Sequence, residues 1–195
     1  RARRRRRSAA AGQLMTPQRQ RLADRGNDLY ETPAGATQAF LAHVALPRRI
    51  WEPACGPGAI VRELRAAGRD VVATDLVDYG ERACAGSASG RDFLMEFSAP
   101  PGVDAIVTNP PYKLATECVT HALSLRVPLV AMLLRLTFIE SERRSAILDR
   151  GKLARLLVFI NRLPTMHRDG WDGPKNKSAG AYAWFIWDQA HDGPA

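Results

Sequence analysis

The feature that most constrains the fold of this chain is an alternation of short apolar runs with segments of helical period. The apolar runs lie at 50–51, 71–74, 104–109 and 128–136. The last of them, PLVAMLLRL, is apolar almost throughout, as expected of a strand that is buried on both faces. Strands joined through helices run parallel, because each crossover returns the chain to the same end of the sheet. The alternation therefore predicts an α/β fold with a parallel sheet covered by helices on both faces.

Four helices are expected beside these strands, at about 33–46, 59–68, 114–125 and 140–148. In the first helix, Thr32 is the expected N-cap, Pro33 takes the first helical position and Pro47 ends the helix. The second helix has an apolar face of helical spacing and is closed by Gly68.

The pattern changes near the C-terminus. Two further apolar runs, 154–160 and 181–187, are joined by a segment without helical period, 161–180. A direct return from one strand to the next implies that the last pair is antiparallel. A loop of this length is expected to be functional or disordered rather than a mere connection.

The basic charge of the chain belongs to its N-terminal arm. The formal net charge is +8, and residues 1–25 hold nine arginines and one acid, whereas residues 26–195 balance 19 basic with 19 acidic residues. Such an arm is too charged to be buried, and we expect it to bind nucleic-acid phosphates non-specifically, with a solvated tail as the alternative. The expected organisation is a basic disordered arm over 1–26, a single domain over 27–188 and a short tail over 189–195.

Cysteine usage and hydropathy narrow the class of protein. Cys55, Cys84 and Cys118 form no CxxC pair and do not cluster with the four histidines, which argues against a metal site and against a disulfide framework. No apolar run approaches the roughly 20 residues of a membrane span. The basic N-terminus is not followed by the apolar segment of a signal peptide. We therefore expect a cytoplasmic protein that binds neither metal nor membrane, and the sequence does not indicate its oligomeric state.

Three polar features are expected at the carboxyl ends of the strands, where open α/β sheets bind ligands. The segment EPACGPGAI turns from a strand into a helix, and Gly56 and Gly58 let its backbone approach a ligand closely. Asp75 ends the next strand, where an acid can hold ribose hydroxyls or, alternatively, cap the following turn. Asp92 and Phe93 pair an acid with an aromatic ring, a combination that can hold adenine. Each feature alone is weak evidence for a nucleotide-type ligand.

The segment DAIVTNPPY marks the end of a third strand at the same edge. Pro110 and Pro111 lack the backbone donor and restrict φ, so they cannot continue a central strand. The chain must leave the sheet there and present Asn109 and Tyr112 at its edge. A strand exit followed by a helix cap, without any function, is the alternative interpretation.

Taken in order, E-x-A-x-G-x-G, an acid after the second strand, D-F and N-P-P-Y resemble the motifs of the class I S-adenosylmethionine-dependent methyltransferases. Within these, residues 28–187 resemble the DNA adenine-N6 methyltransferases, especially the small ones of phages and prophages. The segment DLYETP matches the D-x-Y-x-T-P segment that precedes the glycine motif in many of them. The resemblance implies a Rossmann-like, mostly parallel seven-stranded sheet with an antiparallel last strand. It also implies S-adenosylmethionine as cofactor and DNA as partner.

The resemblance further assigns residues to the cofactor site. Tyr30, Thr32 and Pro33 are expected at the methionine end of the cofactor. The main cradle would consist of Glu52, Ala54, Cys55, Gly56 and Gly58. Asp75 would hold the ribose, Asp92 and Phe93 the adenine, and Asn109 would border the reactive end.

The expected catalytic segment is Asn109, Pro110, Pro111 and Tyr112. The adenine amine is a poor nucleophile, because its lone pair is delocalised into the ring. Asn109 Oδ1 and the Pro110 carbonyl can accept hydrogen bonds from both amine hydrogens and align the nitrogen for attack on the methyl carbon. Catalysis would then depend on positioning rather than on a strong base. Tyr112 would stack on the target base, which must be flipped out of the duplex.

Substrate contacts are expected from the arm and from the 161–180 loop. That loop interleaves basic with aromatic residues, as suits a nucleic-acid backbone with a splayed base, and a solvated loop is the alternative. The residues concerned are Arg162, His167, Arg168, Trp171, Lys175 and Lys177. The chain leaves no room for an inserted target-recognition domain, so we expect low or short sequence specificity. Arg135, at the end of a strand, can reach the site edge or form a surface ion pair.

Several substrates share this chemistry. N-P-P-Y is also used by ribosomal-RNA and protein-glutamine amino-methyltransferases, and an arginine-rich arm binds RNA as well as DNA. The glutamine enzymes usually carry an additional N-terminal helical domain, which is not found here. Cytosine-N4 enzymes usually have serine at the position of Asn109, so adenine is preferred. An inactive cofactor-binding module that docks on nucleic acid is the non-enzymatic alternative.

Overall fold

The computed structural model describes residues 29–148, 152–164 and 180–193. The predicted arm, and with it Asp28 of the DLYETP segment, lies outside the described residues. The strands are β1 (Arg49–Glu52), β2 (Asp70–Thr74), β3 (Ser87–Ala88), β4 (Ala105–Thr108), β5 (Leu129–Arg135), β6 (Leu153–Val158) and β7 (Tyr182–Asp188). The α-helices are α1 (Ala34–His43), α2 (Ala59–Ala66), α3 (Ala115–Ser124) and α4 (Ser145–Leu148). Short 3₁₀ helices lie at Gly80–Arg82, Phe93–Met95, Tyr112–Leu114, Leu136–Ile139 and Glu142–Arg144.

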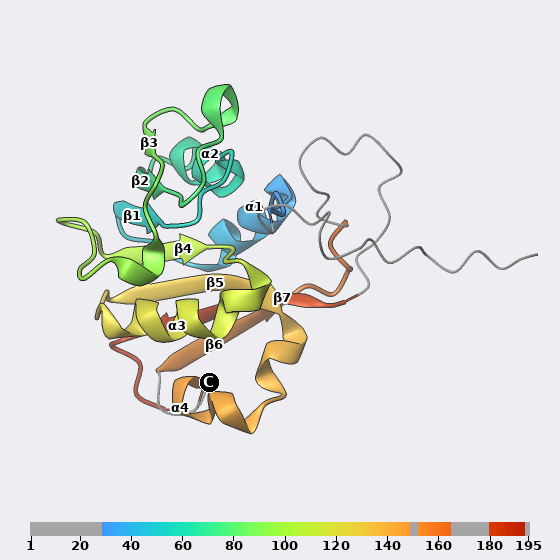
Figure 1. Ribbon diagram of the computed structural model, residues 1–195. Coiled ribbons are helices and arrows are strands. Elements are labelled where there is room, and N and C mark those ends of the chain that lie inside the picture. Colours follow the sequence, from blue (N-terminus) through green and yellow to red (C-terminus); the bar gives the residue numbers. More distant parts are fainter. Residues whose placement is uncertain (1–28, 149–151, 165–179, 194–195) are drawn as a thin grey trace, which may run out of the picture.

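The strands form one seven-stranded sheet in the order β3-β2-β1-β4-β5-β7-β6 (Figure 1). The pairs from β3 across to β5 are parallel, whereas β7 runs antiparallel to both of its neighbours, β5 and β6. The predicted mostly parallel sheet with an antiparallel last strand is thus confirmed. Its central strand pair, β4 and β5, aligns Thr108 with Met132.

Helices cover both faces of the sheet, because the central strands are buried on both sides. In β5, Leu129, Ala131 and Leu133 belong to the core that α1 and α2 complete. The alternate residues Val130, Met132 and Leu134 belong to the core that α3 completes. This split follows from the period of two in a strand and explains why the segment is apolar throughout.

The sequence missed β3. This two-residue strand pairs with β2 at the edge of the sheet and lies in the connector ACAGSASG, which has no apolar run. Backbone pairing alone makes it a strand, since Ser87 and Ala88 have little to bury. The expected helix at 140–148 is also different, because a 3₁₀ turn at Glu142–Arg144 precedes only one turn of α-helix, Ser145–Leu148.

The predicted start of the first helix is wrong by one residue. Pro33, with φ −58° and ψ 135°, occupies the N-cap position, and the helix begins at Ala34. No side chain caps this helix. The Thr32 hydroxyl instead accepts a hydrogen bond from Asn109, so tertiary contact has replaced the local cap.

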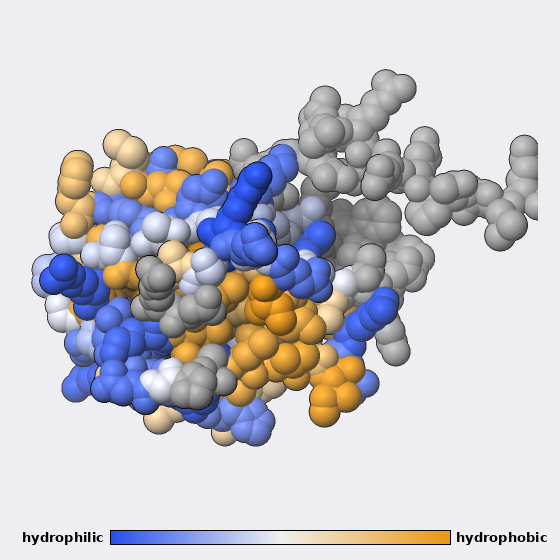
Figure 2. Space-filling model, turned by 90° about the horizontal axis from the view of Figure 1, so that it is seen from below, coloured by the Kyte–Doolittle hydropathy of each residue, from blue (hydrophilic) through white to orange (hydrophobic). Residues whose placement is uncertain are grey.

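None of the described helices is long and apolar enough to cross a membrane. Figure 2 shows, on the face seen from below, hydrophobic surface adjoining charged surface. Large hydrophobic side chains are exposed at several separate places, among them Phe97 after the 3₁₀ turn Phe93–Met95 and Ile160 after β6. Isolated exposed apolar residues are normal on a folded protein.

Candidate active site

A cavity of about 410 Å³ lies at the carboxyl ends of β1, β2 and β4. It has the size and the largely apolar walls of a small-molecule site. Most of the predicted site residues line it, namely Tyr30, Thr32, Glu52, Ala54, Cys55, Gly56, Asp75, Asp92, Phe93, Asn109, Pro110 and Pro111. Pro33, Gly58 and Tyr112 do not line it.

The glycine turn between β1 and α2 is held by the carboxylate of Asp75. The N–H of Gly56 donates to Asp75 Oδ2 at 2.7 Å, and the N–H of Val77 donates to Asp75 Oδ1 at 2.8 Å. Burial raises the pKa of Asp75, and these backbone hydrogen bonds partly offset that rise. Asp75 therefore caps the turn that follows it, which is one of the two interpretations of its sequence position, and its contact with ribose hydroxyls stays a prediction.

Both glycines of the turn have positive φ, +51° at Gly56 and +86° at Gly58. A Cβ at Gly58 would lie 2.3 Å from Cys84 Cβ, which no small shift can relieve. Gly58 thus acts from behind the cavity wall, where it permits the loop around Cys84 to pack against the turn. A Cβ at Gly56 would meet Leu29 Cδ1 at 2.9 Å, so the segment before α1 packs over the front of the turn.

Glu52 is a buried acid at the cavity wall, with 2 % of its surface exposed. A backbone hydrogen bond from Val61, in the first turn of α2, favours its charged form, but burial dominates and raises its pKa well above the ordinary value. Within the described residues its Oε2 atom has no hydrogen-bond partner. A buried acceptor of this kind suits a ligand that brings a donor into the cavity.

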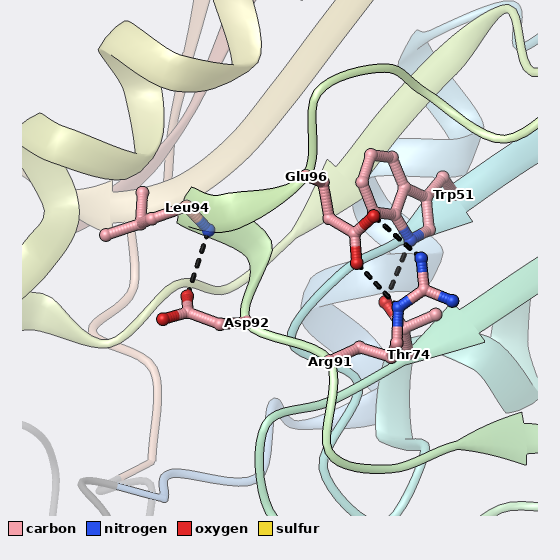
Figure 3. Close-up of polar contacts among 6 residues, drawn as sticks. All are labelled: Trp51, Thr74, Arg91, Asp92, Leu94 and Glu96. Atoms are coloured by element: carbon pink, nitrogen blue, oxygen red, sulfur yellow. Dashed lines mark hydrogen bonds and ion pairs between the residues drawn. The ribbon is translucent and has the colours of Figure 1, made fainter.

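The loop that carries Asp92 and Phe93 is ordered by its own polar contacts (Figure 3). Leu94 N–H donates to Asp92 Oδ1 at 3.0 Å, so this carboxylate caps the 3₁₀ turn Phe93–Met95. Arg91 forms two hydrogen bonds with the Glu96 carboxylate, at 2.6 and 2.7 Å. The Phe93 ring packs edge-on against Trp51, so it contributes to the core as well as to the cavity wall.

Trp51 is itself anchored in the sheet beside this loop. Its indole Nε1 donates to Thr74 Oγ1 at 2.9 Å, a buried bond between β1 and β2 that Figure 3 shows next to the Arg91–Glu96 pair. The wall behind Phe93 is therefore built on two adjacent parallel strands.

Asn109 is held in one orientation by the segment before α1. Its Nδ2 donates to the carbonyl of Tyr30 at 3.2 Å and to Thr32 Oγ1 at 3.1 Å. A backbone carbonyl can only accept, so the amide must present its nitrogen to Tyr30. The buried Oδ1 atom is consequently turned away from Tyr30 and Thr32.

Tyr112 lies in an aromatic cluster rather than in the cavity wall. Its ring stacks on Tyr30 with centroids 5.3 Å apart, and the Tyr182 centroid is 5.7 Å away. The guanidinium of Arg135 lies over the ring, 5.4 Å from its centroid. Burial, together with the neighbouring Tyr182, raises the pKa of the Tyr112 hydroxyl. A base that stacks on this ring must displace one of these neighbours.

The residues predicted for substrate contact are mostly beyond the described part of the chain. Arg162 is exposed. His167, Arg168, Trp171, Lys175 and Lys177 lie outside the described residues, so their role stays a prediction.

Several residues of the cavity wall were not predicted from the sequence. Leu76, Val77 and Tyr79 follow Asp75 directly, and Lys113 follows the N-P-P-Y segment. Their positions just beyond two strand ends were an available signal. Burial raises the pKa of Tyr79 to about 12, and the charge of Asp75 adds to this effect.

The cavity walls suit a ligand that is rich in hydrogen-bond donors. Four carboxyl groups line the cavity, those of Glu31, Glu52, Asp75 and Asp92, together with the cationic side chains of Arg91 and Lys113. S-adenosylmethionine has an ammonium, ribose hydroxyls and an adenine amine, so it brings hydrogen-bond donors that these carboxyl groups can accept. Among the residues that the structure describes, no group of three or more His, Cys, Asp or Glu side chains is placed to hold a metal ion.

No protein-family model matches the chain, and no curated protein matches it. Solved structures do. PH1948 from Pyrococcus horikoshii, described as a candidate RNA methyltransferase, has a TM-score of 0.57 at 12% identity, over 82% of this chain and 85% of that chain. A chain of the E. cuniculi Mtq2–Trm112 complex has a TM-score of 0.55 at 18% identity, over 82% and 96% of the two chains.

TrmN from Thermus thermophilus has a TM-score of 0.51 at 22% identity and matches 85% of this chain. The match covers 51% of TrmN, so this chain spans about half the length of that relative. Likenesses at these identities concern the fold, and the strand order with its antiparallel β7 agrees with them. The chain has the class I Rossmann-like methyltransferase fold.

Proposed function

We propose that this protein transfers a methyl group from S-adenosylmethionine to a planar, conjugated amine. The substrate that the sequence indicates is the N6 amine of adenine in DNA, with low or short sequence specificity. When bound, the cofactor supplies an electrophilic methyl group on a sulfonium. Glu52, the glycine turn, Asp75, Asp92 and Phe93 are the residues that would hold it.

The observation that carries the proposal is the orientation of Asn109 at the cavity. Because Nδ2 donates to Tyr30 and Thr32, Oδ1 is the amide atom that would accept a hydrogen bond from a substrate amine. The amide oxygen would accept a hydrogen bond from that amine and so turn the nitrogen lone pair toward the methyl group. This assistance needs no proton transfer before attack, and it depends on groups that are already in place.

The kind of molecule that bears the amine (DNA, RNA or protein) is less closely indicated than the type of amine. PH1948 is described as a candidate RNA methyltransferase, and the Mtq2–Trm112 complex as responsible for methylation of the termination factor eRF1. These descriptions favour the alternatives of RNA or protein over DNA. The N-P-P-Y segment is compatible with all three, because each offers a conjugated amine.

The test is incubation with labelled S-adenosylmethionine and DNA, RNA or protein in parallel, followed by digestion and identification of the methylated product. Asn109→Ala should abolish methyl transfer while the variant still binds the cofactor. Gln189→Ala, which removes an exposed carboxamide just after β7, is the matched control. Full methyl transfer by Asn109→Ala would refute the catalytic assignment.

Thr32 tests the orientation argument separately. Thr32→Val keeps the shape but removes one of the two acceptors of Nδ2, which leaves the amide held by the Tyr30 carbonyl, and turnover should fall up to roughly tenfold, in line with the loss of one hydrogen bond. Thr32→Ser keeps the hydroxyl and should retain most of the activity. Equal turnover in both variants would show that Thr32 does not orient Asn109.

A further inference from the structure

Arg135 is the last residue of β5, the strand beside the one that ends in N-P-P-Y. It is the only residue of that strand that is exposed, whereas the other six are buried. Its antiparallel partner is Tyr182, whose ring belongs to the Tyr112 cluster. Two strands of the sheet core therefore place this side chain at the carboxyl edge, next to the candidate catalytic segment.

Arg135 keeps its hydrogen-bonding capacity for a ligand. Its guanidinium lies over the Tyr112 ring, and across residues 29–148, 152–164 and 180–193 it forms neither an ion pair nor a hydrogen bond. A planar guanidinium that rests on an aromatic ring keeps its N–H donors at its edge, in a fork that matches phosphate oxygens.

The anion that this arginine suits belongs to the substrate and not to the cofactor. Arg135 and Tyr112 are absent from the cavity wall, whereas Tyr30, on which Tyr112 stacks, is part of it. Arg135 is thus separated from the cavity by the aromatic cluster. A nucleotide whose amine reaches Asn109 carries a phosphate on each side, while a glutamine side chain brings no phosphate.

We propose that Arg135 binds a backbone phosphate beside the target nucleotide, which makes nucleic acid the substrate class of this site. This inference rests on the proposed function. As the phosphate draws the guanidinium away, the Tyr112 face that it covers becomes available to the target base. Lys113, exposed at the cavity mouth, adds a second positive charge on the same segment.

The experiment uses the full chain and fluorescently labelled single-stranded DNA and RNA of the same adenine-containing sequence. Binding is measured over a range of salt concentrations, together with methyl transfer and S-adenosylmethionine affinity. Arg135→Ala should weaken binding of the oligonucleotide roughly tenfold. The slope of the logarithm of the binding constant against the logarithm of the salt concentration should become shallower by about 0.7 for each phosphate contact that is lost. The oligonucleotide affinity of Arg135→Lys should lie between those of Arg135→Ala and wild type. The affinity for S-adenosylmethionine should not change in either variant.

Arg48→Ala is the matched control. Arg48 is exposed and precedes β1, at the amino ends of the parallel strands, whereas the site lies at their carboxyl ends. This variant therefore loses the same charge far from the site. Oligonucleotide binding by Arg135→Ala that equals the control, or exceeds wild type, overturns the inference while leaving the proposed function intact. A wild type that methylates only protein overturns the substrate class. Binding that depends on Arg135 without any methyl transfer supports the phosphate contact and refutes the proposed function instead.

Discussion

At the scale of single residues, the buried acid Glu52 makes a prediction about stability and pH. Burial raises its pKa, so between the ordinary pKa of a glutamate and the raised one the folded protein holds a proton that the unfolded chain has released. The free energy of unfolding therefore falls as the pH rises through this window. Glu52→Gln cannot titrate and should lack that decline.

The measurement is urea unfolding of both proteins at about pH 5 and about pH 8. The stability of Glu52→Gln relative to wild type should increase with pH. Glu81→Gln, which changes an exposed glutamate, controls for the loss of a carboxyl group. A Glu52→Gln difference that is the same at both pH values would mean that the buried carboxyl does not act in this way.

Several site residues could be placed from the sequence because their positions depend on strand ends. Asp75 and Asn109 each follow a recognisable apolar run, and parallel strands bring such ends to one edge. The surroundings of Tyr112 could not be predicted in this way. Its neighbours Tyr30, Arg135 and Tyr182 come from distant segments, and only the packed structure shows that they meet.

At the scale of elements, the turn between β1 and α2 predicts a difference between two glycines. Gly58 and Gly68 both have positive φ, +86° and +77°. Gly68→Ala meets nothing within 4 Å and should cost about 1 kcal/mol for the backbone conformation alone. Gly58→Ala adds the clash with Cys84 Cβ and should cost a further 1–3 kcal/mol or so, with weaker cofactor binding because the turn is displaced.

A double-mutant cycle checks the cause. Cys84→Gly removes the atom that a Cβ at Gly58 would strike, so Gly58→Ala should cost less in that background than in wild type. Chemical unfolding gives the free energies, and calorimetric titration gives the cofactor affinity. If Gly58→Ala were no more destabilising than Gly68→Ala, steric contact with Cys84 would not be what requires this glycine.

Prediction of the elements succeeded where burial governs the sequence and failed where it does not. Apolar runs marked β1, β2, β4, β5, β6 and β7, because these strands pack against helices or neighbouring strands. β3 has two small residues and is held by backbone hydrogen bonds, so no side-chain pattern reports it. The N-cap of α1 was misplaced because the hydroxyl of Thr32 is used by Asn109, 77 residues away.

At the scale of the whole molecule, the charge distribution separates general affinity from local positioning. Residues 26–195 are formally neutral, and the eight excess positive charges lie within 1–25. An exposed arginine such as Arg135 can contribute one phosphate contact, whereas long-range attraction of a nucleic acid would depend on the arm. The two contributions should therefore be separable by experiment.

Replacing the nine arginines of residues 1–25 with glutamine keeps the chain length but removes this charge. We expect the affinity for single-stranded nucleic acid to fall steeply at low salt. The slope of the logarithm of the binding constant against the logarithm of the salt concentration should become shallower by about 0.7 for each phosphate contact that is lost. Turnover at saturating oligonucleotide should be nearly unchanged, because Asn109 and the cavity are untouched. Binding measured against salt concentration, alongside single-turnover methyl transfer, checks both expectations. An unaltered salt dependence would identify the arm as a solvated tail, and a loss of turnover at saturation would mean that it acts within the site itself.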